Sequence, residues 1–148
     1  GQQSSFWTLR EDMSWAQKPE GASIKHDIAV PVGLVPAFIE KADPAVLAIV
    51  PDARIVNFGH MGDGNLHYNV SQPVGWEANT FFALEPAIHE AIYELVLSFG
   101  GSISAEHGIG QMKRDKLAKI KDPVMLSLMR RLKAEIDPAG IMNPGKVL

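Results

Sequence analysis

The feature that most constrains the fold is a short segment with the sequence HMGDGNLH, at residues 60–67. Its two glycines can adopt positive φ, and its aspartate and asparagine tolerate that conformation, so the segment predicts a tight turn. Residues typical of β-strands flank it on both sides. We therefore expect a β-hairpin with strands at Arg54–Gly59 and Leu66–Ser71. A hairpin brings its ends together, so the rings of His60 and His67 could face one point.

The composition excludes several classes of protein. The chain has 148 residues, a net charge of −3 and no cysteine. It therefore has no disulfides or thiolate metal sites, and we expect a reducing, cytoplasmic location. The scattered cations give no reason to expect a nucleic-acid partner, and no apolar run approaches the ~20 residues that span a bilayer. No signal peptide is apparent at the N-terminus, which begins with glycine, and we expect the natural protein to extend upstream.

The order of predicted elements indicates an α+β fold. Hydrophobic periodicity and breaker residues predict strands at 24–31, 54–59, 66–71 and 102–104, and helices at 6–16, 36–41, 79–99, 114–119 and 123–136. Between residues 24 and 104 this order is β-α-β-β-α-β, the ferredoxin-like arrangement of an antiparallel sheet with helices on one face. We accordingly expect an N-terminal helical segment at 1–20, the ferredoxin-like unit at 21–106 and a helical tail at 107–148.

Three local signals set the expected helix boundaries. Asp43-Pro44 should interrupt the helix that begins near Pro36, because proline lacks an amide donor. Asn79 or Thr80 could cap the long helix, and a proline at position 86 is early enough to be tolerated or to kink the first turns. Gly100-Gly101 should end that helix.

Two histidines and one carboxylate form a candidate metal site. His60, His67 and Glu106 offer the donor types that suit zinc or a neighbouring divalent ion with open coordination positions. The plain alternative is that the glycine-rich segment is only a turn and that the histidines are ordinary polar residues. Asp63 could also be a ligand, but we expect it to accept hydrogen bonds from backbone N–H groups of the turn.

Further residues could bind or deprotonate a substrate. His107 follows Glu106 directly, and a neutral imidazole near a cation suits proton abstraction, although an exposed loop histidine is the simpler explanation. Arg10 and Lys25 could dock a carboxylate, while solvated surface charges are again the simpler explanation.

Five motifs resemble one known family. They are WTLRE at 7–11, KHDIAVPV at 25–32, GHMGDGNLHYN at 59–69, SISAEHGIG at 102–110 and DPAGIMNPGK at 137–146. Together they resemble the C-terminal portion of FAD-linked oxidases of the vanillyl-alcohol oxidase type, in the branch of D-lactate, glycolate and D-2-hydroxyglutarate dehydrogenases. The resemblance covers nearly the whole chain, and the third and fourth motifs at this separation are the most specific.

The resemblance implies a role for each matching residue. It implies that His60, His67 and Glu106 bind a divalent metal, with zinc as the first choice and manganese or iron as alternatives, and that His107 is the catalytic base. The substrate contacts implied by the resemblance are Arg10, Ser14, Lys25 and Asn69. Asn143 and Lys146 match the tail that returns towards the flavin. The implied reaction oxidises a D-2-hydroxy acid: the metal acidifies the hydroxyl, His107 takes its proton, and a hydride passes to FAD.

The FAD-binding domain of this family lies upstream of the matching region and nothing here resembles it. We therefore expect this chain to be a fragment that binds little FAD and turns over no substrate alone. Its expected partners are the upstream FAD-binding domain and a small 2-hydroxy acid, and the formation of a homodimer is left open. Two alternatives remain at this stage: a metal-dependent hydrolase, and a ferredoxin-like binding module without chemistry.

Overall fold

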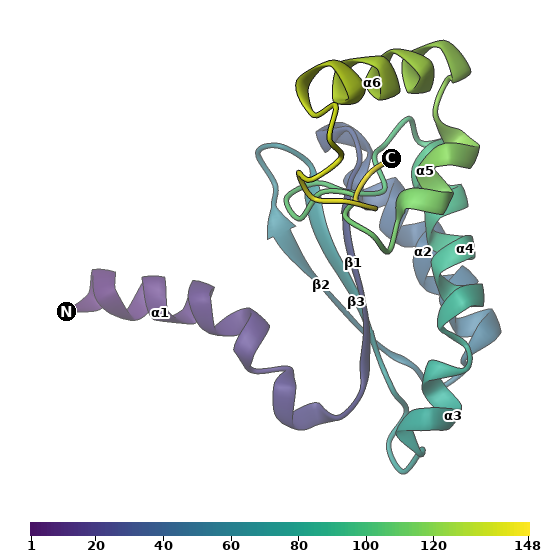
Figure 1. Cartoon of the computed structure of the whole chain (residues 1–148). Coiled ribbons are helices and arrows are strands. Elements are labelled where there is room, and N and C mark those ends of the chain that lie inside the picture. The colour runs from purple at the N-terminus through teal and green to yellow at the C-terminus, as the bar shows by residue number, and fades with distance from the viewer. The chain divides into compact units, whose positions relative to one another are not determined.

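The computed structural model describes all 148 residues and divides them into two compact units, Gly1–Glu106 and His107–Leu148. The first unit contains a three-stranded antiparallel sheet, and the second contains two helices and the C-terminal segment (Figure 1). None of the helices is both long and apolar enough to cross a membrane.

The sheet is built from β1 (Ser23–Ala29), β2 (Arg54–His60) and β3 (Asn65–Ser71) in the order β1-β3-β2. The predicted hairpin is confirmed, since β2 and β3 pair antiparallel with His60 opposite Asn65. On its other edge β3 pairs antiparallel with β1, which places Asp27 opposite His67. Because side chains alternate along a strand, these registers divide the sheet into two faces with different partners.

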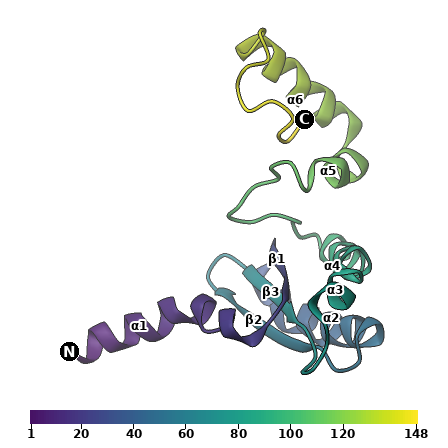
Figure 2. The ribbon, with the colours of Figure 1, turned by 60° about the horizontal axis from the view of Figure 1, so that its bottom comes forward.

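One face of the sheet is covered by α2 (Val35–Ile49) and α4 (Glu85–Ser98), which contact each other and lie on the same side of the strands (Figures 1 and 2). Their buried side chains meet those of β1 and β3 to form the core. Its fully buried apolar members include Ile24, Ile28, Phe38, Val46, Tyr68, Val70, Ile88, Ile92 and Val96. The opposite face, which we call the open face, carries the polar residues considered below.

The prediction that Asp43-Pro44 interrupts the helix was wrong. α2 continues through Pro44 and ends at Ile49. A proline in a helix removes the hydrogen bond to the carbonyl four residues earlier and its ring crowds that carbonyl, at a cost of about 3 kcal/mol. Phe38, Ala42 and Val46 recur at four-residue intervals and are all buried, so packing against the core favours a continuous helix.

The long helix predicted from Asn79 or Thr80 is instead two helices. α3 (Ala78–Phe82) precedes α4, and neither helix has a side-chain N-cap hydrogen bond. Pro86 lies in the first turn of α4, where its missing donor is harmless, but a helix continuing from α3 would place the proline in its interior. At the other end the prediction is confirmed: α4 stops at Ser98, and Gly100 adopts φ +70° just beyond it.

The predicted fourth strand is reduced to one isolated bridge between Ala29 and Ser102. The helices and the three-stranded antiparallel sheet confirm the α+β class. The complete ferredoxin-like arrangement, which needs four strands, stays a prediction. Ahead of the sheet, α1 (Gln2–Trp15) extends the helix expected at 6–16 and buries none of its residues. Phe6, Leu9 and Trp15 are strongly exposed on it.

The second unit contains α5 (Arg114–Ile120) and α6 (Pro123–Ile136), both close to prediction. The carboxylate of Asp122 caps α6 by accepting the amides of Val124 and Met125, each at 3.0 Å. After α6, Asp137 accepts the amides of Ile141 and Met142 and a hydrogen bond from the Lys133 ammonium. The hydrogen bond from Lys133 is the main cause that lowers the pKa of Asp137.

Candidate metal centre on the open face of the sheet

The hairpin turn is fixed by a glycine and an aspartate. Gly64 adopts φ +75°, and a Cβ at this position would lie 1.9 Å from the carbonyl oxygen of Val30. The Gly64 carbonyl accepts the Val30 amide at 3.1 Å, so the two backbone segments lie too close together for any side chain at position 64. Asp63 Oδ1 accepts the amide of Asn65 at 3.0 Å, which confirms the turn role expected for this aspartate.

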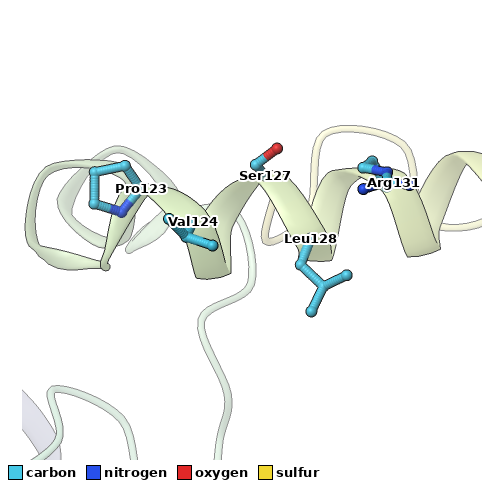
Figure 3. A pocket seen from close by; sticks show the side chains of 5 residues that line it. All are labelled: Pro123, Val124, Ser127, Leu128 and Arg131. Carbon is cyan, nitrogen blue, oxygen red and sulfur yellow. The ribbon is translucent and has the colours of Figure 1, made fainter.

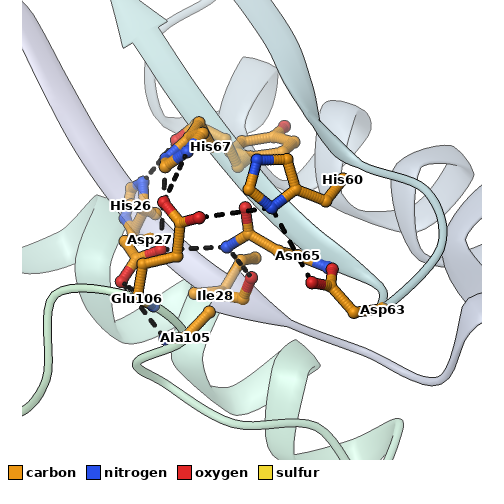
Figure 4. A network of polar contacts seen from close by, with 10 residues as sticks. His26, Asp27, Ile28, His60, Asp63, Asn65, His67, Ala105 and Glu106 are labelled. Carbon is orange, nitrogen blue, oxygen red and sulfur yellow. Dashed lines mark hydrogen bonds and ion pairs between the residues drawn. The ribbon is translucent and has the colours of Figure 1, made fainter.

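Glu106 lies between the two hairpin histidines (Figure 4). Its Oε1 is 3.2 Å from Nδ1 of His60, and its Oε2 is 3.4 Å from Nε2 of His67. All three side chains are part-exposed, so the centre is reachable from solvent. The structure thus brings together the three residues that the sequence suggested as metal ligands, from β2, β3 and the segment after residue 102.

A buried carboxylate that sequence reasoning did not single out lies beside this centre. Asp27 is 4% exposed, and its Oδ2 accepts the backbone amides of Ala105 at 3.1 Å and Glu106 at 3.0 Å. Its Oδ1 lies 4.0 Å from Nδ1 of His67. The available signal was the alternation of residues 25–31, which places Asp27 on the same face as Lys25 and opposite to Ile28 and Val30.

Asn65 completes the buried part of the centre. Its Nδ2 donates to Asp27 Oδ1 at 3.0 Å and to the carbonyl of Ile28 at 3.3 Å. Both partners are acceptors only, so the amide nitrogen must face them and Oδ1 must point the other way. That buried Oδ1 has no hydrogen-bond partner, and in Figure 4 it points towards the contact between His60 and Glu106.

Two overlapping sets of residues could hold a metal ion. Asp27, His67 and Glu106 each place one donor atom within 4.8 Å of the others. The sequence instead suggested His60 with His67 and Glu106. Zinc–ligand bonds of 2.0–2.1 Å in a tetrahedron put neighbouring donor atoms about 3.3 Å apart, close to the two histidine–Glu106 separations in the structure. The two histidines approach different oxygens of Glu106, and the donor types of both sets suit zinc. The unpaired Oδ1 of Asn65 adds an acceptor for a hydroxyl group bound there.

Two of the expected substrate contacts share the open face with the centre. Lys25 is exposed and is the register partner of Asn69. This pair lies two residues along the strands from the pair of Asp27 and His67, so both pairs are on the same face. The Nδ2 of Asn69 donates to the buried Gln17 at 2.9 Å, which ties the chain after α1 to the sheet. The open face therefore carries a cation and an amide next to the candidate ligands.

The remaining candidates lie on α1 and in the second unit. Arg10 and Ser14 are exposed on α1, where the Arg10 guanidinium lies 5.9 Å from the centroid of the Trp7 ring. Exposed His107 begins the second unit. Within that unit Asn143 adopts φ +48°, and Lys146 donates to Gln111 at 3.3 Å. The roles implied for these five residues stay predictions.

A second histidine pair lies on the covered face of the sheet. His26 Nδ1 is 2.8 Å from the carbonyl of Tyr68, and His26 Nε2 is 2.9 Å from Nδ1 of His89. His89 Nε2 is 3.2 Å from Glu85, and the ring of His89 stacks on Tyr93. Burial, followed by the negative charges of Glu85 and Asp27, raises the pKa of Tyr93 to about 12.

The second unit carries a groove on α6. Pro123, Val124, Ser127, Leu128 and Arg131 line it, all from α6 (Figure 3). Its lining combines apolar side chains with one hydroxyl and one guanidinium, and it contains no carboxylate or histidine. The groove therefore lacks the acid–base and metal-binding groups that the centre on the sheet provides.

Known proteins match the chain along its whole length. The family model described as "FAD linked oxidases, C-terminal domain" matches residues 1–147. The chain is 43% identical over 99% of its length to a D-2-hydroxyglutarate dehydrogenase of Stutzerimonas stutzeri, and 39% identical over 97% to the mitochondrial D-2-hydroxyglutarate dehydrogenase of Bos taurus. It is 38% identical over 93% of its length to an uncharacterized FAD-linked oxidoreductase of Mycobacterium tuberculosis. The chain spans 31%, 25% and 28% of these proteins, respectively.

Proposed function

The chain belongs to the family of FAD linked oxidases, C-terminal domain, and on that premise we propose that it is the metal- and substrate-binding part of a dehydrogenase. The complete enzyme oxidises a D-2-hydroxy acid to the 2-oxo acid with FAD as electron acceptor. D-2-hydroxyglutarate is the first substrate to test, since relatives at 43% and 39% identity carry that name.

The observation that carries the proposal is the convergence of His60, His67 and Glu106 on the open face. These residues would hold a divalent ion, with zinc as the first choice and manganese or iron as alternatives. When bound, the metal supplies Lewis-acid polarisation of the substrate hydroxyl, and the flavin supplies the redox chemistry.

The other residues bind and orient the substrate. Lys25 and Asn69 lie on the face that carries the metal ligands, so a carboxylate held there has its α-carbon next to the centre. Arg10 and Ser14 add donors to the same carboxylate, and His107 accepts the hydroxyl proton at an imidazole nitrogen. Asn143 and Lys146 contribute to the flavin side of the site.

The test uses the full-length protein that contains this chain. Loaded with FAD and zinc, it should reduce an artificial electron-accepting dye when D-2-hydroxyglutarate is added, and D-lactate tests whether a second carboxylate on the substrate is needed. The chain of residues 1–148 alone should reduce no dye. Absence of dye reduction by the loaded full-length protein with any D-2-hydroxy acid would overturn the proposal.

A further inference from the structure

We propose that Asp27 is a positioning residue of the metal centre, which orients the ligands without binding the ion. The inference rests on the proposed metal site and extends it to a residue that the ligand set does not include. Asp27 contacts the surroundings of each of the three candidate ligands.

The first contact fixes Glu106. The side chain of Glu106 is 43% exposed, so no core packing holds it in place. The segment that carries it forms only one β-bridge with the sheet, between Ala29 and Ser102. Two backbone amides of this segment, those of Ala105 and Glu106, donate to Asp27 Oδ2. Hydrogen bonds to a charged carboxylate are stronger than those between neutral groups, so Asp27 fixes the position of the backbone that carries the Glu106 side chain.

The second contact reaches the hairpin. Asp27 Oδ1 accepts Nδ2 of Asn65 at 3.0 Å, and Asn65 is the register partner of His60. Asp27 itself is the register partner of His67. One carboxylate on β1 therefore ties together the end of the hairpin and the Glu106 segment, which are distant in sequence.

The third contact concerns the proton of the His67 ring. Glu106 faces Nε2 of His67, whereas Asp27 lies 4.0 Å from Nδ1. When Nε2 binds the ion, the ring proton is on Nδ1, where the carboxylate of Asp27 faces it. Metal-binding histidines commonly present their second ring nitrogen to such a carboxylate.

Asp27 is less suited to be a ligand itself. Its Oδ2 already accepts two amides and its Oδ1 accepts the amide of Asn65. Three of the roughly four lone-pair positions of the carboxylate are therefore in use, and only one, on Oδ1, is left for an ion. His60, which is 40% exposed, has its Nδ1 next to Glu106 and loses no such bond on binding metal.

The first experiment measures the zinc dissociation constant of the full-length protein by competition with a chromophoric chelator. Asp27→Asn should weaken zinc binding about 10- to 100-fold, as expected for a residue that orients ligands. Asp63→Asn is the matched control: its carboxylate lies 3.7 Å from Nδ1 of His60 but is exposed, so its removal should cost no more than about fivefold. Glu106→Gln should abolish stoichiometric binding.

The second experiment needs no variant of Asp27, so it remains decisive if Asp27→Asn fails to fold. Nitrogen-15 spectra of the histidine-labelled, zinc-loaded full-length protein report which ring nitrogen of His67 binds the ion and which carries the proton. The peak is assigned with His67→Gln. We expect the proton on Nδ1.

Three outcomes would overturn the role of Asp27: a proton on Nε2 of His67, an unchanged zinc affinity in Asp27→Asn, or, in an Asp27→Asn protein that is folded, a complete loss of zinc equal to that of Glu106→Gln, which would make Asp27 a ligand. Failure of the proposed function gives a different result. In that case the unaltered protein binds no zinc or oxidises no D-2-hydroxy acid.

Discussion

Two pairs of histidines lie on opposite faces of the same three strands, and they are held in opposite ways. On the covered face, His26 is 1% exposed and donates from Nδ1 to a fixed carbonyl acceptor, because a carbonyl can only accept. On the open face, the rings of His60 and His67 are part-exposed and converge on a single carboxylate. The first pair stabilises the core, whereas the second has donor atoms to offer to a ligand. A one-residue step along β1, from His26 to Asp27, separates the two environments.

The largest expected effect comes from removing a ligand on the open face. His60→Ala should lower the rate of the full-length enzyme about 10³-fold, since Lewis-acid stabilisation is worth several kcal/mol and each 1.4 kcal/mol is tenfold. Steady-state dye reduction and metal analysis by mass spectrometry measure the two quantities. The half-exposed ring supports little packing, so the unfolding midpoint should hardly change.

The matched variant for that test is His89→Ala on the covered face, which should keep its metal content. If His60→Ala retained both metal and activity, the assignment of the open-face pair as the functional one would be wrong.

For His26 we expect a loss of stability in place of a loss of metal and activity. His26→Ala leaves a cavity and removes the donor to the Tyr68 carbonyl, which should lower the free energy of unfolding by about 3 kcal/mol. Urea denaturation of the chain measures the loss. Lys25→Ala, one residue earlier and exposed, should change stability by less than about 0.5 kcal/mol. Equal losses in the two variants would show that the faces do not differ as described.

Alkaline pH should also reveal the covered face. The chain has two tyrosines, and burial raises the pKa of both Tyr68 and Tyr93, that of Tyr93 to about 12. Above pH 10 the unfolded chain releases phenol protons that the folded chain keeps, so the unfolded state gains stability as the pH rises.

The tyrosine contribution to the free energy of unfolding should therefore be constant below pH 10 and fall between pH 10 and 12 by up to about 1.4 kcal/mol per pH unit for each tyrosine. Tyr93→Phe should remove about half of that slope in urea titrations at pH 9 to 12. A slope that is unchanged in Tyr93→Phe would contradict the burial of its phenol as the cause.

The hairpin was predictable from sequence because its determinants are local. Gly64 needs a positive φ and Asp63 bonds the amide two residues later, and both requirements are visible within one turn. Glu106 could be proposed from its residue type alone. Its place between two histidines depends on contacts made across the sheet, which periodicity does not reveal.

The parts that sequence reasoning missed depend on distant contacts. Asp27 acquires its role only when residues 105 and 106 return to β1, nearly eighty residues later in the chain. Similarly, Pro44 is tolerated within α2 because buried side chains on both sides of it hold the helix against the core. Local propensity favoured a break there, and tertiary packing determined the outcome.

The smallest effect that still separates the two faces concerns Tyr68. Its hydroxyl donates to Asp43 Oδ1 on α2 at 2.8 Å, a hydrogen bond to a charged acceptor. Tyr68→Phe should lower the free energy of unfolding by about 1.5 kcal/mol, while zinc affinity and turnover of the full-length protein should stay unchanged. A double-mutant cycle with Asp43→Asn isolates the hydrogen bond from any change in packing. Because Tyr68 alternates with His67 on the same strand, a change in zinc affinity would mean that β3 transmits strain from the covered face to the open face.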